Sequence, residues 1–329
     1  MKNSKLEIPK DSLFLVTGGA GFIGSNLCEA LLRKGYKVRC LDNLSTGLQR
    51  NVEIFFDNPN YEFIEGDIKE LEICKKSCEN VNYVLHQAAW ESVPRSFEIP
   101  LIYLENNVMG MANMLEAAKH CGVKKFVYAS SSAIYGNSQN LPQKEDSMGI
   151  CLSPYAATKL MNEETARQYS LNFQVDTYGL RYFNVFGRRQ NPNADYSAVI
   201  PNFLKYLLND TAPVIYDDGL QSRDFTYIDN VIDANLKACQ ADSKIAGNVF
   251  NIACGHQISL LEVYKIINEI LEKNIPPKFE SARLGDIKHS CADISKAKNL
   301  LGYFPKYNFY EGIKLTVEWY KKFWRRHFI

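Results

Sequence analysis

Tyr155 and Lys159 stand four residues apart in a stretch whose pattern predicts a helix. That spacing places both side chains on one face of the helix, one turn apart. A neighbouring ammonium favours the tyrosinate form and lowers the pKa of a tyrosine from about 10 toward neutral pH. Tyr155 is therefore predicted to act as a general base for the proton of an alcohol. Ser131 follows a predicted strand closely and could share that proton.

Three glycines form a second candidate site near the start of the chain. Gly18, Gly21 and Gly24 are spaced three residues apart between a predicted strand and a predicted helix. Glycines there permit a tight turn and close approach to a pyrophosphate, which the N–H groups of the helix N-terminus then bind. Asp42, at the end of the next strand, can bind both ribose hydroxyls and would repel a 2′-phosphate, which favours NAD over NADP. Asp67 is predicted to be either an adenine contact or a strand-end turn.

These residues need a framework of alternating strands and helices. Short apolar runs and helical periodicity indicate six strands and the main helices between them. The expected strands are Leu13–Thr17, Lys37–Leu41, Tyr61–Ile64, Val81–His86, Lys125–Ala129 and Val175–Leu180, and the expected helices are Phe22–Lys34, Asn106–His120 and Ser153–Leu171. This alternation predicts an α/β fold, namely a Rossmann-type doubly wound parallel sheet with a smaller C-terminal α/β substrate domain. We expect an NAD-binding domain over residues 1–184 and a substrate domain over 185–329, with a segment near 224–245 returning to the first.

The composition is that of an ordinary globular protein. Among 329 residues, 38 Lys and Arg face 37 Asp and Glu, so the chain lacks the positive field that nonspecific nucleic-acid binding needs. Nine cysteines include no C-x-x-C, and Cys74 and Cys78 lack a nearby His pair, so we expect no metal and a reducing, cytoplasmic setting. No segment resembles a signal peptide or an apolar membrane span. The basic, aromatic tail Trp319–Arg326 is expected to pack on the body rather than on a membrane surface.

Short motifs spread over nearly the whole chain carry a family resemblance. They are Thr17 to Gly24, Leu41 to Asn43, Gly66-Asp67, His86 to Ala89, Ser130 to Gly136, Ser153 to Lys159 and Leu180 to Gly187. As a set they resemble the extended short-chain dehydrogenase/reductase family, and within it the UDP-sugar 4-epimerases. The resemblance implies that Tyr155 takes the 4-hydroxyl proton while C4 passes a hydride to NAD, and that the hydride returns to the opposite face of a 4-keto sugar. Lys159 would hold the nicotinamide ribose, Ser131 would bridge Tyr155 and the sugar, and NAD would stay tightly held.

The serine loop separates the reactions of this family. In this loop the sugar-nucleotide dehydratases share an Asp-Glu pair, and the decarboxylase branch has a Glu. This chain has Ser132-Ala133 at those positions. Without an acid for elimination, the resemblance implies simple oxidation and re-reduction at C4. A non-catalytic NAD-binding scaffold is the alternative from another class. It would predict the loss of a catalytic residue, and Tyr155, Lys159 and Ser131 are all present.

The resemblance also implies binding residues. Cofactor contacts are implied at Gly18, Gly21, Phe22, Ile23, Gly24, Asp42, Asn43, Asp67, Ile68, Gln87, Ala88, Ala89, Asn107, Tyr155, Lys159 and Tyr182. Substrate contacts are implied at Glu91, Ser131, Ser132, Tyr155, Asn184, Gln190, Ala198, Val199, Arg223, Arg283, Asp286 and Ser290. Of these, the resemblance implies diphosphate contacts for Asn184, Arg223 and Arg283. The two arginines suit this role because their guanidinium groups match phosphate oxygens. Residues 199–202 would lie along the uracil.

The substituent at C2 of the sugar is a finer question. In this family a residue shortly after an Arg-x-Gly-Asp turn controls the space at C2, and counting from Asp286 it is Ser290, which leaves room for an acetamido group. Further matches to the branch that prefers N-acetylated sugars are Ser132, Asn184, Gln190 and Ala198. Glu91 departs from that branch, which usually has glycine there. We expect a UDP-N-acetylglucosamine 4-epimerase, with UDP-glucose and UDP-galactose as a possible second pair. A uronate epimerase, with Arg95 or Arg188 binding the carboxylate, is the remaining alternative.

The resemblance implies a homodimer as well. Its interface would use the helices near Asn106–His120 and Tyr155–Leu171. The apolar positions that could face the partner are Val108, Met111, Leu115, Leu160 and Ala166. The same residues would equally serve the core of a monomer, so the sequence leaves both roles open.

Overall fold

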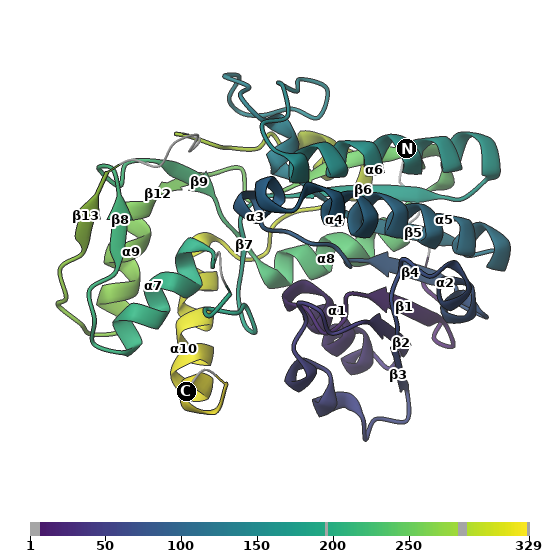
Figure 1. Cartoon of the computed structure of the whole chain (residues 1–329), viewed down its shortest axis with the longest axis horizontal. Helices are drawn as coiled ribbons and strands as arrows, with labels where there is room; N and C mark the ends of the chain where they lie inside the picture. Colours follow the sequence, from purple (N-terminus) through teal and green to yellow (C-terminus); the bar gives the residue numbers. More distant parts are fainter. Residues whose placement is uncertain (1–6, 195–196, 282–287, 328–329) are drawn as a thin grey trace.

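A parallel sheet organises most of the chain. The computed structural model describes residues 7–194, 197–281 and 288–327, without the side chains of 325–327. Seven parallel strands form this main sheet in the order β11-β6-β5-β4-β1-β2-β3 (Figure 1). Their bounds are β1 Leu13–Thr17, β2 Lys37–Asp42, β3 Tyr61–Glu65, β4 Tyr83–His86, β5 Lys125–Ser131, β6 Thr177–Tyr182 and β11 Asn248–Ile252. The Rossmann-type α/β fold predicted from the sequence is confirmed.

Helices cover both faces of the main sheet, which is why its strands are apolar runs rather than alternating ones. The helices α1 and α8 lie on one face, and α2, α5 and α6 lie on the other (Figure 1). The helix bounds are α1 Phe22–Arg33, α2 Leu71–Cys78, α3 Val93–Glu98, α4 Pro100–Tyr103, α5 Gly110–Cys121, α6 Pro154–Phe173, α7 Val199–Leu208, α8 Ile228–Cys239, α9 Leu260–Ile270 and α10 Phe309–His327. Short 3-10 or π segments are η1 Gln49–Asn51, η2 Glu53–Phe55, η3 Leu104–Met109, η4 Ser132–Tyr135, η5 Ser243–Ile245 and η6 Ala297–Leu301.

Helix α6 positions both members of the Tyr-Lys pair. The Ser153 hydroxyl caps its N-terminus by accepting a hydrogen bond from the Ala156 N–H (3.1 Å), and Pro154 occupies its first turn. The helix ends before Gln174, whose φ of 58° is left-handed. Because the cap and the proline are local signals, the sequence predicts the start of this helix to within one residue.

Two elements differ from the sequence prediction. The expected helix Asn106–His120 belongs to a longer helical stretch that begins with α4 at Pro100, passes through the π segment η3 and ends at Cys121. The strand β11 is not among the six expected strands, and it comes from the second half of the chain to pair with β6. Its place in the sheet is determined by long-range pairing with β6 rather than by a local sequence pattern.

The second half of the chain contributes a smaller lobe, at the left of Figure 1. Helices α7, α9 and α10 pack together there beside the pairs β8–β13 and β9–β12. The short strands are β7 Val185–Phe186, β8 Val214–Tyr216, β9 Ser222–Asp224, β10 Thr226–Tyr227, β12 Gln257–Ser259 and β13 Lys278–Glu280. Tyr320 and Trp324 are buried, so the C-terminal helix packs on the body. Helix α8 contacts β5 and β6, and β11 joins the main sheet, so two segments return to the first lobe. The division at residue 184 stays a prediction.

The cysteines of this structure form no disulfide bonds. All nine are free thiols, and Cys74 and Cys78 are buried on α2. In the described ranges, no group of three or more His, Cys, Asp or Glu side chains could hold a metal ion. The same ranges contain no helix whose length and apolar character would let it cross a membrane.

Candidate active site

The three candidate catalytic side chains meet at the carboxyl edge of the main sheet. Ser131 is the last residue of β5, and its side chain is hydrogen-bonded to that of Tyr155 in the first turn of α6. Lys159, one turn further along α6, donates from Nζ to the Ala129 carbonyl at 2.9 Å. Its Nζ also lies 5.9 Å from the centroid of the Tyr155 ring. Parallel sheets bind ligands at this edge, so the arrangement fits a reacting alcohol beside the Tyr155 hydroxyl.

Burial shifts the pKa values of the titratable side chains around Tyr155. Burial raises the pKa of Tyr155, although the hydrogen bond with Ser131 acts in the opposite direction. The sequence predicted a lowered pKa from the nearby ammonium, and in this structure that prediction is wrong, because desolvation of the buried phenol, together with the Glu91 carboxylate, raises the pKa instead. Burial also lowers the pKa of Lys159 to about 8, against the opposing effect of the nearby carboxylates. Burial and the Lys159 charge lower the pKa of His86 to about 3, so this imidazole is neutral.

The glycine loop has the form that a dinucleotide pyrophosphate requires. Gly18 has a φ of +69°, and a Cβ there would lie 2.7 Å from the Ala88 nitrogen. A Cβ at Gly24 would lie 2.1 Å from the Gly18 carbonyl oxygen. Gly21 begins α1 without any side-chain cap, which leaves the first N–H groups of the helix, including those of Phe22 and Ile23, for a ligand. The residues present therefore fit NAD.

The ends of β2 and β3 supply the polar groups expected for the adenosine half. Asp42 is buried, and its carboxylate accepts hydrogen bonds from the N–H groups of Ala20 (2.9 Å) and Leu44 (2.8 Å). Burial raises the pKa of Asp42, and these two hydrogen bonds oppose that shift. Asn43 donates to the Asp67 carboxylate at 3.0 Å, so the loops after β2 and β3 are joined. Ile68, just beyond, is buried beside them.

The remaining expected cofactor residues lie at the ends of β4 and β6. The Tyr182 hydroxyl donates to Gln87 Oε1 at 3.3 Å and accepts from Asn235 at 2.9 Å. Ala88 N donates to the Thr17 hydroxyl at 3.3 Å, and half-buried Ala89 follows it. The chain after β4 therefore lies directly against the glycine loop.

Asn107 has a different environment from the other expected cofactor residues. Its Oδ1 accepts from the Trp90 N–H at 2.8 Å, and its Nδ2 donates to the Trp90 carbonyl (3.0 Å) and the Thr158 hydroxyl (3.1 Å). The side chain is 1% exposed. Asn107 therefore holds the segment after β4 in place.

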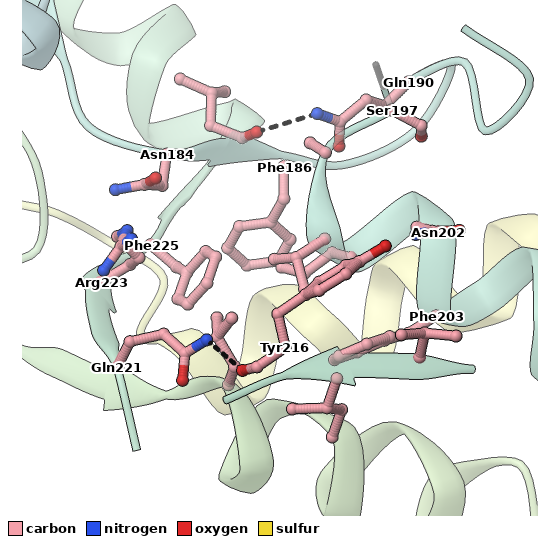
Figure 2. A pocket seen from close by; sticks show the side chains of 17 residues that line it. Asn184, Phe186, Gln190, Ser197, Asn202, Phe203, Tyr216, Gln221, Arg223 and Phe225 are labelled. Atoms are coloured by element: carbon pink, nitrogen blue, oxygen red, sulfur yellow. Dashed lines mark hydrogen bonds between the residues drawn. The ribbon is translucent and has the colours of Figure 1, made fainter. Parts of the chain in front are cut away.

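A cavity of about 280 Å³, lined by residues from the second half of the chain, brings several expected substrate residues together. Its wall includes Asn184, Gln190, Ala198, Val199 and Arg223 (Figure 2). The sequence did not single out four further residues that line this cavity, which are Phe186, Tyr216, Gln221 and Phe225. An apolar cavity with a few polar groups suits a base and sugar with their phosphates.

Two amide oxygens in this cavity have no hydrogen-bond partner among the described residues. Gln190 Nε2 donates to the Val185 carbonyl at 3.2 Å, and Gln221 Nε2 donates to the Tyr216 carbonyl at 2.8 Å (Figure 2). These bonds fix the orientation of both amides, and each Oε1 is left buried and without a partner. A buried acceptor of this kind is costly unless something donates to it. The cavity is therefore suited to a ligand with N–H or O–H groups.

Several expected substrate residues lie elsewhere. Ser132 is half-buried at the start of η4, next to Ser131. Ser290 is buried beside β9, where its N–H donates to the Ser222 carbonyl at 3.1 Å, but it does not line the cavity. Arg283 and Asp286 lie outside the described residues. Glu91 follows β4 and interacts electrostatically with Lys159 and Tyr155.

Alanine at Gly24 tests the glycine loop as a cofactor site. The new Cβ would meet backbone atoms of Gly18, which cannot move away cheaply, so we expect a loss of about 1 to 3 kcal/mol in stability and the loss of copurifying NAD. Gly122→Ala is the control, because its φ of +66° costs about 1 kcal/mol but no atom lies within 4 Å. Nucleotide released by heat is quantified by chromatography. A Gly24→Ala protein with a full complement of NAD would contradict this assignment.

Comparisons with known proteins agree with one another. The NAD dependent epimerase/dehydratase family matches residues 14–253. A putative UDP-glucose 4-epimerase of Methanocaldococcus jannaschii is 37% identical over 94% of this chain and 98% of its own length. A UDP-N-acetylglucosamine 4-epimerase from Methanobrevibacter ruminantium M1, in complex with UDP-N-acetylmuramic acid, is 39% identical with a TM-score of 0.89, covering 95% of this chain and 99% of its own. A UDP-glucuronic acid 4-epimerase from Bacillus cereus, in complex with UDP-glucuronic acid and NAD, is 35% identical with a TM-score of 0.87, covering 94% and 99%.

Proposed function

Because the chain belongs to the NAD-dependent epimerase/dehydratase family, we propose that it interconverts UDP-N-acetylglucosamine and UDP-N-acetylgalactosamine. The broader activity is that of an NAD-dependent UDP-sugar 4-epimerase, the activity that its relatives share. Those relatives act on three different sugars by name, so the choice of sugar depends on the residues of this chain.

Tyr155, Ser131 and Lys159 have different roles in the proposed reaction. In its tyrosinate form Tyr155 accepts the proton of the sugar 4-hydroxyl, and Ser131, next to Tyr155, contacts the same hydroxyl. Because burial raises the pKa of this phenol, the tyrosinate depends on nearby positive charge to stabilise it. Lys159, anchored on the Ala129 carbonyl, places a positive charge beside the phenol as its proton moves. NAD, when bound, supplies the acceptor for the C4 hydride, later its donor, and a positive charge near the phenol. The 4-keto sugar then turns over, and Tyr155 returns the proton to the new hydroxyl.

The Gln190 side chain is the observation that carries the proposal for an N-acetylated sugar. Its buried Oε1 lacks a partner among the described residues, and an acetamido N–H is a matching donor. Ala198 in the same wall is small, which leaves space for the acetyl group. A plain hexose would present a hydroxyl there and leave part of that space unfilled.

Incubation with UDP-N-acetylglucosamine, without added NAD, tests this choice. Proton NMR should show UDP-N-acetylgalactosamine rising to a steady ratio. UDP-glucose and UDP-glucuronate are run beside it, and kcat/KM is compared. The proposal is wrong if either of these two is turned over at least as efficiently as the N-acetylated sugar.

We also propose that the protein is a homodimer, through an apolar face that coincides only in part with the one expected. Of the positions predicted for the interface, Met111, Leu115 and Ala166 are fully buried in the core, so they cannot face a partner. Their burial follows from the packing of α5 against α2 and α6. The exposed apolar residues around α3, α4, η3 and α6 include Phe97, Leu101, Leu104, Met109, Leu160 and Met161. These elements contact one another, and exposed apolar patches commonly mark interfaces.

Lysine at Leu101 and Met161 tests the dimer. These side chains are 72% and 46% exposed, so the fold should tolerate the change while a desolvated charge opposes association. We expect wild type to sediment at twice the chain mass of 37.5 kDa and the double variant at that mass. Ile54→Lys, at a position 57% exposed on η2, is the control and should remain dimeric. A monomeric wild type would refute the proposal.

A further inference from the structure

The segment after β4 holds Glu91 in a fixed place. Its predecessor Trp90 is bonded through both N–H and carbonyl to the buried Asn107 side chain, at 2.8 and 3.0 Å. Its successor Ser92 caps α3 and accepts a hydrogen bond from the Tyr103 hydroxyl at 2.7 Å. Both neighbours of Glu91 are therefore anchored, so its backbone has little freedom to turn the carboxylate elsewhere.

The Glu91 side chain lies in the catalytic cleft. It is exposed to solvent, yet it interacts electrostatically with Lys159, Tyr155 and Tyr103. The Tyr103 ring in turn meets the Tyr155 ring edge-on, with centroids 6.5 Å apart. Although part of Glu91 reaches solvent, the protein packed around its carboxyl group raises its pKa, and the Lys159 charge opposes that rise. No residue that the structure describes donates a hydrogen bond to its carboxylate.

The cations near this cleft already have other partners. Arg188 is committed to Asp229 at 2.8 Å and to Glu29 at 3.5 Å. The Arg95 guanidinium lies over the Trp90 ring, 4.8 Å from its centroid. In the part of the chain that the structure describes, Lys159 is the cation whose charge acts on the Glu91 carboxyl group, and that carboxylate already balances it. A carboxylate on the sugar would therefore meet a like charge beside the reacting groups.

We propose that Glu91 acts as a charge filter, which admits neutral UDP-hexoses to the catalytic cleft and rejects UDP-hexuronates. This inference rests on the proposed UDP-sugar 4-epimerase function and narrows its substrate class. Like charges brought together at a binding site suppress the wrong partner. A filter of this kind would separate the chain from its uronate-specific relative on the same fold.

Glu91→Gln and Glu91→Gly distinguish charge from volume. Glutamine keeps the size and removes the charge, whereas glycine removes both. With UDP-glucuronate and UDP-glucose as probes, we measure the ratio of the two kcat/KM values for each protein. We expect the glutamine variant to raise the uronate-to-neutral ratio at least about tenfold. Glu53→Gln, an exposed acid on η2, is the control and should leave the ratio unchanged.

The kinetic ratios of the wild type and the Glu91 variants decide whether Glu91 acts as a charge filter. A wild type that turns over UDP-glucuronate as well as UDP-glucose would overturn it. So would a ratio that rises with glycine but not with glutamine, because volume rather than charge would then be responsible. If wild type epimerises no UDP-hexose, the proposed function fails, and calorimetric titration of both nucleotides onto the same NAD-loaded proteins tests the filter alone. A gain in uronate affinity with Glu91→Gln would support it, and equal affinities would refute it.

Discussion

Phenylalanine at Tyr155 is expected to lower kcat for epimerisation by about 10² to 10⁴-fold, the range of effects for a general acid–base group. The phenol oxygen is the group that we propose exchanges the proton of the sugar hydroxyl, and it is hydrogen-bonded to Ser131. The ring would keep its edge-on contact with Tyr103, so the fold and the NAD content should not change. Kinetics by NMR, together with released nucleotide and thermal melting, check the three expectations separately.

Tyr103→Phe is the matched control for that experiment. It removes a second phenol oxygen in the same cleft, one that donates to the Ser92 carbonyl rather than to the substrate. The loss of this hydrogen bond should change kcat by less than about tenfold. If Tyr155→Phe retained activity comparable to the Tyr103→Phe protein, another group would have to carry the proton, and the assignment of Tyr155 would be wrong.

The positions of the catalytic residues could be read from the sequence because their signals are local. Four-residue spacing on a helix with a Ser-Pro start fixes Tyr155 and Lys159 on one face. The end of an apolar strand fixes Ser131 at the carboxyl edge of the sheet. The pKa of Tyr155 could not be read in the same way. It depends on how much protein surrounds the phenol, and that protein comes from segments far away in the chain.

The residues that line the cavity of the smaller lobe were harder to predict from the sequence, because they too depend on contacts between distant segments. Tyr216 and Gln221 line the cavity from β8 and the loop before β9, and neither element has a strong local pattern. Likewise, nothing in the apolar periodicity of α5 and α6 told the core residue Met111 apart from the exposed Met161. Which face of a helix is covered depends on its neighbours, and these are known only once the sheet order is known.

A buried ion pair joins β6 to α6 behind the catalytic residues. Arg181 donates from Nε and Nη2 to the two carboxylate oxygens of Glu163, each at 2.8 Å, and these side chains are 2% and 7% exposed. Glu163 also accepts a hydrogen bond from the Ser130 hydroxyl. The carboxylate therefore links the end of β5, where Ser131 follows, to the helical turn after Lys159.

Glutamine at Glu163 is expected to lower the free energy of unfolding by about 3 to 5 kcal/mol, because Arg181 keeps its charge in a buried place without a counter-ion. Glu164→Gln, whose ion pair with Arg167 lies at the surface and is screened by water, should cost far less. Urea denaturation of the NAD-loaded proteins measures both, and equal losses would refute the prediction.

The double variant Arg181→Met/Glu163→Leu separates the two roles of this ion pair. It removes both charges, so much of the stability lost in Glu163→Gln should return, since apolar residues can replace a buried ion pair. Activity should not return with it, because Ser130 loses the carboxylate that ties β5 to α6. Recovery of stability without recovery of kcat would show that the pair positions Ser131 against Tyr155. Recovery of both stability and kcat would show that the Arg181–Glu163 pair only stabilises the fold.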